Sequence, residues 1–356
     1  MRSFAAIHDG CGVHALIPNV HARVETLSTA AGPLPATVHD AGAGDAWICS
    51  PRSTYVDYAA QEAQRYMHVG LGPWTTRVIA SIGTAVEWSG LDRAVALNNW
   101  LLSTNLYPPL GSIDLSSLMS EAVKRWPGYT LWFRSLNTED NTGWLEALRA
   151  AGCNLVAARQ VYFYSDVASA VDQHHNLRRD LALLRQTSLT HSPDHSITEA
   201  DYPRIAELYH MLYIRKYSGF NPVYSADFLA RWHRAGLLAF EGFRDGDGRL
   251  ASVVGIFRLG QTATAPIVGY DTAQPRRAGL YRLATGCAYR ACIEHGWRLN
   301  LSAGAAEFKR LRGGHPLIEY SAVYARHLPR RTRHAVALLS AATCRIGAPL
   351  LGRYRL

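Results

Sequence analysis

The fold of this chain is organised around residues 299–314, which read LNLSAGAAEFKRLRGG. Residues 297–301 are apolar and suited to a buried strand, and the small residues 302–304 interrupt that strand. A short helical run follows at 305–311 and ends at a Gly-Gly pair. A strand that enters a helix through such a turn leaves backbone N–H groups free at the helix start, where anions bind.

Three cations lie on this short helical run: Lys309, Arg310 and Arg312. Adjacent fixed cations favour a phosphate group or a developing oxyanion. Because aminolysis of an ester passes through an oxyanion, Lys309 is the first candidate for a catalytic residue. Two alternatives remain open: Lys309 positions a phosphate without catalysing a reaction, or the run is a surface helix with solvated cations.

The positive charge of the chain is concentrated near its C-terminus. The net charge is +9, yet the residues from Arg276 onward carry 15 Lys and Arg and only 3 Asp and Glu. After Glu319 there is no acid, and seven Arg follow. This asymmetry indicates a polyanionic partner: tRNA, another nucleic acid, a nucleotide cofactor or an anionic membrane. The alternative is a solvated basic face.

The composition fits a soluble globular protein, with 48% hydrophobic and 18% charged residues. The six Cys and fifteen His show no metal-ligand spacing, so we expect no metal site and reduced thiols in a cytoplasmic protein. The first residues meet a charge too early for a signal peptide. The apolar run at 335–351 carries Arg345 and Pro349, so we expect an amphipathic helix and no membrane span.

The length of 356 residues suggests two domains. We predict a lead-in at 1–46 with one or two strands, an N-terminal domain at 47–190, a C-terminal domain at 191–330 and a basic helix or tail at 331–356. In the N-terminal domain we expect strands at 47–51 and 76–82, with a helix at 54–66 between them. Both domains show strands, helix, strand, short helix and strand, which predicts mixed α/β sheets with a ligand at the end of a central strand.

Polar residues follow two neighbouring strands of the predicted N-terminal domain, one at 94–97 and one at 130–133. The candidate substrate-binding residues among them are Asn98, Asn99, Ser103, Thr104, Asn105, Arg134 and Asn137. Because adjacent strand ends converge, we expect these side chains to line one pocket for an acceptor substrate. Local hydrogen bonds between loop side chains and the backbone are the alternative.

Four further candidates lie in the C-terminal domain. Asp271 ends a strand and can accept the proton of an attacking amine, or cap a turn. Tyr281 can donate to a leaving oxygen, or pack on the sheet at the start of a helix. Tyr213 and Lys216 lie near a helix end and suit stacking on an adenine or ribose, although Tyr213 also fits a core position.

The C-terminal domain resembles the GNAT acyltransferase superfamily. The resemblance rests on a strand at 267–270, the loop QPRRAG at 274–279 and the long helix after it. In that superfamily the loop Arg/Gln-x-x-Gly-x-Gly/Ala binds the cofactor pyrophosphate on backbone N–H groups. This implies donor binding by Arg276, Arg277 and Gly279, while Tyr281 stands at the position of the final small residue.

Two such units in one chain look like the Fem-type peptidyltransferases, double-GNAT proteins that take an aminoacyl group from aminoacyl-tRNA. They also look like the tRNA-dependent amide-forming GNAT proteins of natural-product pathways. The segment Phe308-Lys309-x-x-x-Gly313 is similar to the Phe/Tyr-Lys-x-x-x-Gly stretch of Fem-type domains, whose lysine lies by the reacting carbonyl. The resemblance covers residues 48–330 and implies two tandem GNAT-like domains, with Ser302, Arg310 and Arg312 on the donor side.

The leading hypothesis is an aminoacyl-tRNA-dependent aminoacyltransferase, an enzyme of class EC 2.3. It forms an amide bond between an amino acid and a small amine-bearing acceptor, with the tRNA acceptor end as partner and no tightly bound cofactor. One alternative is a GNAT N-acyltransferase that uses acetyl-CoA or another acyl-CoA. The other is a non-catalytic GNAT-fold module that binds nucleic acid or a protein.

Overall fold

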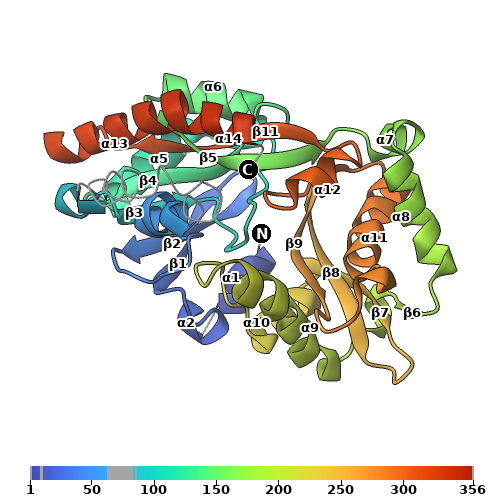
Figure 1. Ribbon diagram of the computed structural model, residues 1–356. Helices are drawn as coiled ribbons and strands as arrows, with labels where there is room; N and C mark the ends of the chain where they lie inside the picture. The colour runs from blue at the N-terminus through green and yellow to red at the C-terminus, as the bar shows by residue number, and fades with distance from the viewer. Residues whose placement is uncertain (1, 9–10, 62–82, 85, 355–356) are drawn as a thin grey trace. The chain divides into compact units, whose positions relative to one another are not determined.

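The computed structural model describes residues 2–8, 11–61, 83–84 and 86–354 (Figure 1). Two compact units make up the chain. The first comprises Met1–Arg159, Ser218–Val223 and Ile318–Arg353, and the second Gln160–Tyr217, Tyr224–Leu317 and Tyr354–Leu356. These units are interleaved along the chain and do not follow the predicted boundaries, because strands β5 (Asn154–Tyr164) and β11 (His315–Tyr324) each supply residues to both.

The first unit is built on a mixed sheet with the hydrogen-bonded strand order β1-β2-β3-β4-β11-β5. Its remaining strands are β1 (Ala22–Thr29), β2 (Gly32–Asp40), β3 (Arg93–Leu97) and β4 (Thr130–Leu136). β3 and β4 run parallel, and β1/β2, β2/β3 and β4/β11 are antiparallel. The lead-in at 1–46, for which one or two strands were predicted, contains the two paired strands β1 and β2 of this sheet.

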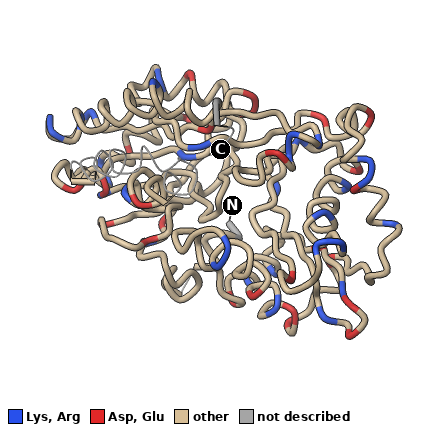
Figure 2. The backbone as a smooth tube through the Cα atoms, in the orientation of Figure 1, with Lys and Arg blue, Asp and Glu red and all other residues tan. Residues whose placement is uncertain are grey.

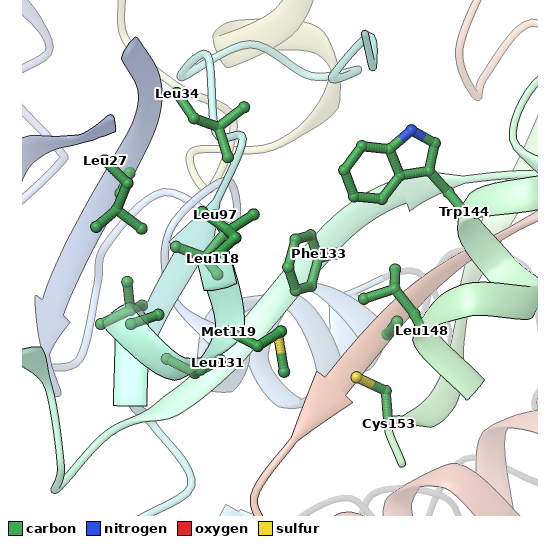
Figure 3. Packing of buried hydrophobic residues seen from close by; sticks show 14 of the residues in the cluster. Leu27, Leu34, Leu97, Leu118, Met119, Leu131, Phe133, Trp144, Leu148 and Cys153 are labelled. Carbon is green, nitrogen blue, oxygen red and sulfur yellow. The ribbon is translucent and has the colours of Figure 1, made fainter. Parts of the chain in front are cut away.

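Helices α5 (Leu115–Arg125) and α6 (Thr142–Ala150) pack on one face of this sheet. Asp114 caps α5 by accepting the N–H of Ser117, and the apolar side of each helix is buried. Figure 3 shows Leu118, Met119, Trp144 and Leu148 from these helices gathered around Phe133 of β4. The helices α1 (Arg2–His8) and α2 (Val13–Leu16) precede the strands.

The C-terminal helix of this unit packs one side against a second apolar cluster, distinct from the cluster around Phe133. It comprises α13 (Arg330–Ala342), a π-helical turn at Thr343–Gly347 and α14 (Ala348–Tyr354). Val336 and Leu339 are buried with Trp132 of β4 and Val156 of β5. The predicted C-terminal helix is therefore confirmed.

The second unit has the strand order β5-β10-β9-β8-β7-β6. Its strands after β5 are β6 (Thr190–Ser192), β7 (Leu238–Arg244), β8 (Leu250–Leu259), β9 (Thr262–Tyr270) and β10 (Arg298–Asn300). β10 runs parallel to β9 and antiparallel to β5. The helices are α7 (Val167–Gln173), α8 (His175–Gln186), α9 (Tyr202–Tyr209), α10 (Ala226–Arg234), α11 (Leu280–His295) and α12 (Ala306–Arg310).

The predicted class, a mixed α/β protein with helices on twisted sheets, is confirmed by these two units. The strand predicted at 47–51 is wrong: residues 47–49 form a turn, because Trp47 is held by its backbone N–H on Phe220 O and its indole N–H on Asn221. Of the helix predicted at 54–66, residues 54–61 are helical. Residues 62–66 and the strand predicted at 76–82 lie outside the described residues. All six cysteines carry free thiols.

Candidate functional site

The segment 299–314 leaves β10 through a strained loop. Ser302, Gly304 and Ala305 all have left-handed φ angles of 59°, 78° and 49°. A non-glycine residue in this region costs about 1–3 kcal/mol. The loop is held by Asn300, whose side-chain oxygen accepts the Ser302 N–H at 2.9 Å, and by the first residues of α12. Strain maintained by its surroundings is a common property of functional loops.

Lys309 is buried at the centre of this loop, with a relative exposure of 4%. Its ammonium donates to the carbonyl oxygens of Leu301 (2.7 Å), Ser302 (3.2 Å) and Ala303 (2.8 Å). It also lies 5.7 Å from the centre of the Tyr162 ring. A buried ammonium needs such partners to offset its lost hydration. The alternative of a surface helix with solvated cations is therefore wrong for this residue.

Arg312 is also buried, and it belongs to an internal ion pair. Its guanidinium bonds the carboxylate of Asp180 and the carbonyl of Phe308, and Arg282 bonds the same carboxylate from α11. A buried guanidinium needs an anion, and Asp180 supplies it. The expectation that Arg312 faces an external donor is therefore corrected by the structure. Arg310 donates to the hydroxyl of Tyr162 at 3.3 Å.

Aromatic side chains surround the same part of the second unit. The ring of Tyr281 lies 4.8 Å from that of Phe308 and 5.9 Å from that of Tyr270. Burial, and then the neighbouring tyrosines, raise the pKa of Tyr281 well above its ordinary value. Its phenol therefore stays protonated at neutral pH and keeps an O–H group that can donate a hydrogen bond or a proton. Both the packing and the donor interpretations of this residue remain consistent with its position.

Tyr213 and Lys216 lie in a π-helical stretch, His210–Tyr217, that continues α9. Tyr213 stacks on Tyr209 at 4.7 Å, and Lys216 is exposed and donates to the Tyr270 hydroxyl at 3.3 Å. π-helical turns occur frequently at functional sites. The two predicted substrate residues therefore share one aromatic surface with Tyr270.

Asp271 follows β9 and has partners at both carboxylate oxygens. One oxygen pairs with Arg204 at 2.8 Å, and the other accepts the backbone N–H of Ala273 at 3.0 Å. The second bond is a turn of the kind that Asp commonly forms. The turn-capping interpretation thus describes its observed contacts.

The loop after Asp271 leads to the start of α11 and carries two exposed cations. Arg276 and Arg277 form a single 3₁₀ turn, and no described residue makes an ion pair or hydrogen bond with their side chains. Gly279 follows in the left-handed region with φ of 66°, and no side chain caps the helix. The left-handed φ favours glycine there, and a Cβ would also require the end of the Leu183 side chain, 2.9 Å away, to shift. An uncapped start of a 16-residue helix beside two free guanidiniums suits a phosphate group.

In the first unit the predicted polar cluster divides into two sets. Asn98, Asn105 and Asn137 hold loops: Asn98 bonds Leu106 O, Asn105 accepts the Trp100 N–H, and Asn137 accepts the N–H groups of Glu139 and Asp140. For these residues the structure shows the local hydrogen bonds of the alternative interpretation. Of the seven residues expected to line one pocket, only Arg134 lines the cavity that the structure shows here.

The second set meets around Arg134, as the convergence of β3 and β4 predicts. Arg134 donates to Asn99 at 3.0 Å, and the nearby Arg159 bonds Ser103 O and Thr104 while forming a two-point pair with Glu319. Both guanidiniums lie over the Trp47 ring, at 5.1 and 4.7 Å from its centre. The sequence analysis missed Arg159, Glu319 and Trp47. The signal that could have found Arg159 is that it is a charged residue in the otherwise mainly apolar strand 154–164.

One terminal nitrogen of Arg134 can donate a hydrogen bond but has no partner among the described residues. Arg134 has an exposure of 8%, and this nitrogen is buried. Burial lowers its pKa, and the positive charge of Arg159 acts in the same direction. The guanidinium lines a small cavity with Trp47, Ser50, Tyr55 and Ser321. Such an unsatisfied buried donor is suited to an anionic or carbonyl group of a ligand.

One further cluster in the second unit has metal-ligand geometry. His191, Glu241 and Cys287 place one ligand atom each within 4.8 Å of one another. Arg290 pairs with Glu241 and contacts His191. A guanidinium thus already neutralises the carboxylate, and burial raises the pKa of the Cys287 thiol to about 12. The cluster is better described as an ion-pair network than as a metal site.

Comparisons with known proteins give similarities of fold at low sequence identity. No family model and no curated protein matches the chain. Among solved structures, the C-terminal domain of a putative lysylphosphatidylglycerol synthetase from Agrobacterium fabrum is 14% identical over 70% of this chain and 82% of that one, with a TM-score of 0.48. FemX is 10% identical over 64% and 79%, with a TM-score of 0.47. A tandem GNAT protein from the clavulanic acid pathway is 14% identical over 65% and 75%, with a TM-score of 0.38.

Proposed function

We propose that this chain is an aminoacyl-tRNA-dependent aminoacyltransferase, which joins an amino acid to a small amine-bearing acceptor through an amide bond. The observation that carries the proposal is the start of α11. Arg276 and Arg277 are exposed there, without partners among the described residues, beside uncapped helix N–H groups. Phosphates of a large polyanionic donor fit this combination of charge and free donors.

The C-terminal excess of basic residues favours tRNA over a small acyl donor. The residues from Arg276 onward carry 15 Lys and Arg against 3 Asp and Glu. Arg282 and Arg312 are neutralised by Asp180, and the remaining excess still exceeds what one pyrophosphate needs. Cytoplasmic localisation belongs to the same proposal, since charged tRNA is found there.

The chemistry requires few groups, because the ester of an aminoacyl-tRNA is already activated. The acceptor amine attacks the ester carbonyl carbon, and the oxyanion that forms needs a positive charge or N–H donors. Collapse breaks the ester C–O bond and returns the electron pair to the ribose oxygen, which takes a proton. We assign oxyanion stabilisation to the positive charge of Lys309, which acts through space because the carbonyls of residues 301–303 take its three N–H donors. We assign the donation of that proton to the neutral phenol of Tyr281. The proton lost by the amine passes to water, since both oxygens of Asp271 are engaged.

The acceptor is assigned to the group around Arg134 in the first unit. The free N–H donor of Arg134 and the face of Trp47 suit an acceptor that carries a carboxylate or phosphate besides its amine. Asn99 and Thr104 fix the two guanidiniums and so orient that group.

The test is transfer of a radiolabelled amino acid from a charged tRNA pool to candidate amino acids and amino sugars. We expect product that disappears when the tRNA is first digested with RNase. The double variant Arg276→Ala/Arg277→Ala should lower the rate at least tenfold, through a higher KM for tRNA. A matched control is Arg234→Ala/Arg249→Ala, which removes two exposed arginines elsewhere in the same unit and should leave the rate unchanged.

The acyl-CoA alternative uses the same helix start, since a left-handed glycine before an uncapped helix also suits a pyrophosphate. The two donors are separated by thermal shift with acetyl-CoA and with uncharged tRNA, using the same pair of double variants. Stabilisation by acetyl-CoA alone, lost in Arg276→Ala/Arg277→Ala, would replace the tRNA proposal by the alternative.

A further inference from the structure

A basic cavity lies in the first unit, away from the Arg134 group. It opens where β5 begins and β11 ends, has a volume of about 220 Å³, and is lined by Arg149, Arg326 and Arg333 with Gly152, Cys153, Asn154 and Ala325. No acid is among the lining residues. In the described parts of the chain these three guanidiniums have no ion pair or hydrogen bond, so their charge is available to an external anion.

One guanidinium of the cavity occupies the space that a side chain at position 152 would fill. Gly152 has φ of 91°, and a Cβ on it would lie only 2.2 Å from the guanidinium carbon of Arg326. Arg326 therefore lies directly against the backbone of Gly152. Any other residue at position 152 would displace it.

The helix that follows the cavity exposes large apolar side chains among its arginines. Arg330–Gly352 is, by length and composition, apolar enough to cross a membrane, and only 11% of its most apolar window is buried. Leu338, Ile346 and Leu350 are exposed at 70%, 62% and 37%. The helix carries Arg330, Arg331, Arg333 and Arg345 and no acid, and Figure 2 marks its start in blue.

Trp88 extends this surface beside the first turn of α13. Its side chain is 69% exposed, Arg331 lies over its ring at 5.9 Å, and Thr332 bonds the carbonyl of the adjacent Ser89. The neighbouring Glu87 pairs with Arg52. Exposed Trp next to Arg is the composition found at the interface between lipid head groups and acyl chains.

The opposite side of this helix is bonded to strand β5 of the first unit. Thr332, Val336 and Leu339 are buried, Ser340 donates to Leu155 O, and Thr343 accepts the N–H of Ala157. A helix that crossed a bilayer would lose these contacts and place Arg345 in the hydrocarbon. A helix that keeps them can lie flat, with its outer side in the head-group region.

From this combination we propose that the surface formed by α13, α14, Trp88 and the three-arginine cavity docks on an anionic phospholipid bilayer. Leu338, Ile346, Leu350 and Trp88 enter the boundary between head groups and acyl chains. Arg149, Arg326 and Arg333 hold a lipid phosphate in the cavity. Two signals, apolar insertion and cation–phosphate pairing, are together what reversible membrane binding needs. The proposal does not depend on acyl transfer.

The test is flotation of the full-length protein with vesicles of phosphatidylcholine containing 30% phosphatidylglycerol, and with phosphatidylcholine alone. We expect at least tenfold stronger binding to the anionic vesicles. The variant Arg149→Gln/Arg326→Gln/Arg333→Gln should lose at least tenfold in binding. Leu338→Asn/Ile346→Asn should lose about fivefold or more with every charge kept, which separates insertion from simple charge attraction. The control Arg234→Gln/Arg249→Gln should bind like the wild type.

The outcomes decide the proposal in either direction. Equal binding of the wild type to both vesicle types, or binding kept by both surface variants, overturns it. Retention in the membrane after carbonate extraction at pH 11 overturns it in favour of a spanning helix. If uncharged tRNA binds through the three arginines and vesicles do not, the surface is a nucleic-acid site. Should a variant misfold, as judged by its melting temperature, the lipid selectivity of the wild type remains decisive.

Discussion

At the scale of single residues, Lys309 has a structural role as well as the catalytic role proposed for it. Lys309→Met removes the donor for three backbone carbonyls and an ion from a buried position, so we expect the free energy of unfolding to fall by about 2–4 kcal/mol. Urea denaturation measures this. Lys309→Arg keeps the charge but cannot fit the same three acceptors, and should recover less than half of the loss. A Met variant as stable as the wild type would show that these hydrogen bonds do not hold the loop.

Arg134 should behave in the opposite way, because its buried charge is incompletely satisfied. Arg134→Met replaces it with an apolar chain of similar length and leaves the Arg159–Glu319 pair intact. We expect the free energy of unfolding to stay unchanged or rise by up to about 2 kcal/mol, while product formation falls by a hundredfold or more. Denaturation and the transfer assay on one preparation check both. Loss of stability together with activity would mean that Arg134 is a structural residue.

His39 gives the first unit a pH-dependent contribution to stability. Its ring bonds Asp45 at 2.7 Å and the carbonyl of Asp92 at 3.0 Å, and His21 contacts the same Asp45. Burial alone lowers the pKa of His39, but Asp45 and the charge of Asp92 outweigh burial and raise it. A raised pKa stabilises the fold below the ordinary value and loses that effect as pH rises through the folded value.

The destabilisation caused by His39→Gln should therefore be larger at pH 6 than at pH 8.5. Chemical denaturation at the two pH values measures it. A larger loss of unfolding free energy at pH 8.5 would show that the fold does not stabilise the charged form of His39.

At the scale of elements, close contact between α9 and β9 depends on a missing side chain. A Cβ at Gly269 would lie 2.7 Å from the backbone of Leu208 and Tyr209. Backbone cannot yield as a flexible side chain does, so Gly269→Ala should cost about 2–4 kcal/mol of unfolding free energy. Gly246→Ala, in the turn after β7 with nothing within 4 Å, should change it by less than about 0.5 kcal/mol. Equal melting temperatures for the two variants would contradict this packing argument.

Elements with a regular apolar period were predictable from the sequence, and those held by long-range contacts were not. The long helix expected after residue 279 is α11, and α5 and α11 are both closed by local signals. Residues 47–49 carry strand-like side chains, but Trp47 is fixed by residues 220 and 221, which no local pattern reveals. Arg134 and Asn99 follow the adjacent strands predicted at 130–133 and 94–97, so the sequence alone predicts that they lie close together. Arg159 and Glu319 lie 160 positions apart, and the sequence does not predict their contact.

At the scale of the whole molecule, the first unit is closed by a segment from the other end of the chain. β11 is the neighbour of β4, and α13 covers the cluster around Trp132 and Val156. Residues 1–190, the predicted lead-in and first domain, therefore lack one strand and one helix of their own core. A sheet without an internal strand leaves backbone groups and apolar side chains unpaired.

We accordingly expect the fragment 1–190 to be unfolded or aggregated alone, and to gain native structure when co-expressed with 318–356. The fragment 160–317 holds nearly all of the second unit and should fold by itself. Dispersion of amide signals in NMR spectra, with cooperative thermal unfolding as a second measure, distinguishes these cases. The two fragments differ in whether the core of their unit is complete. A well-dispersed spectrum of 1–190 without the segment 318–356 would therefore refute the closing role of β11 and α13.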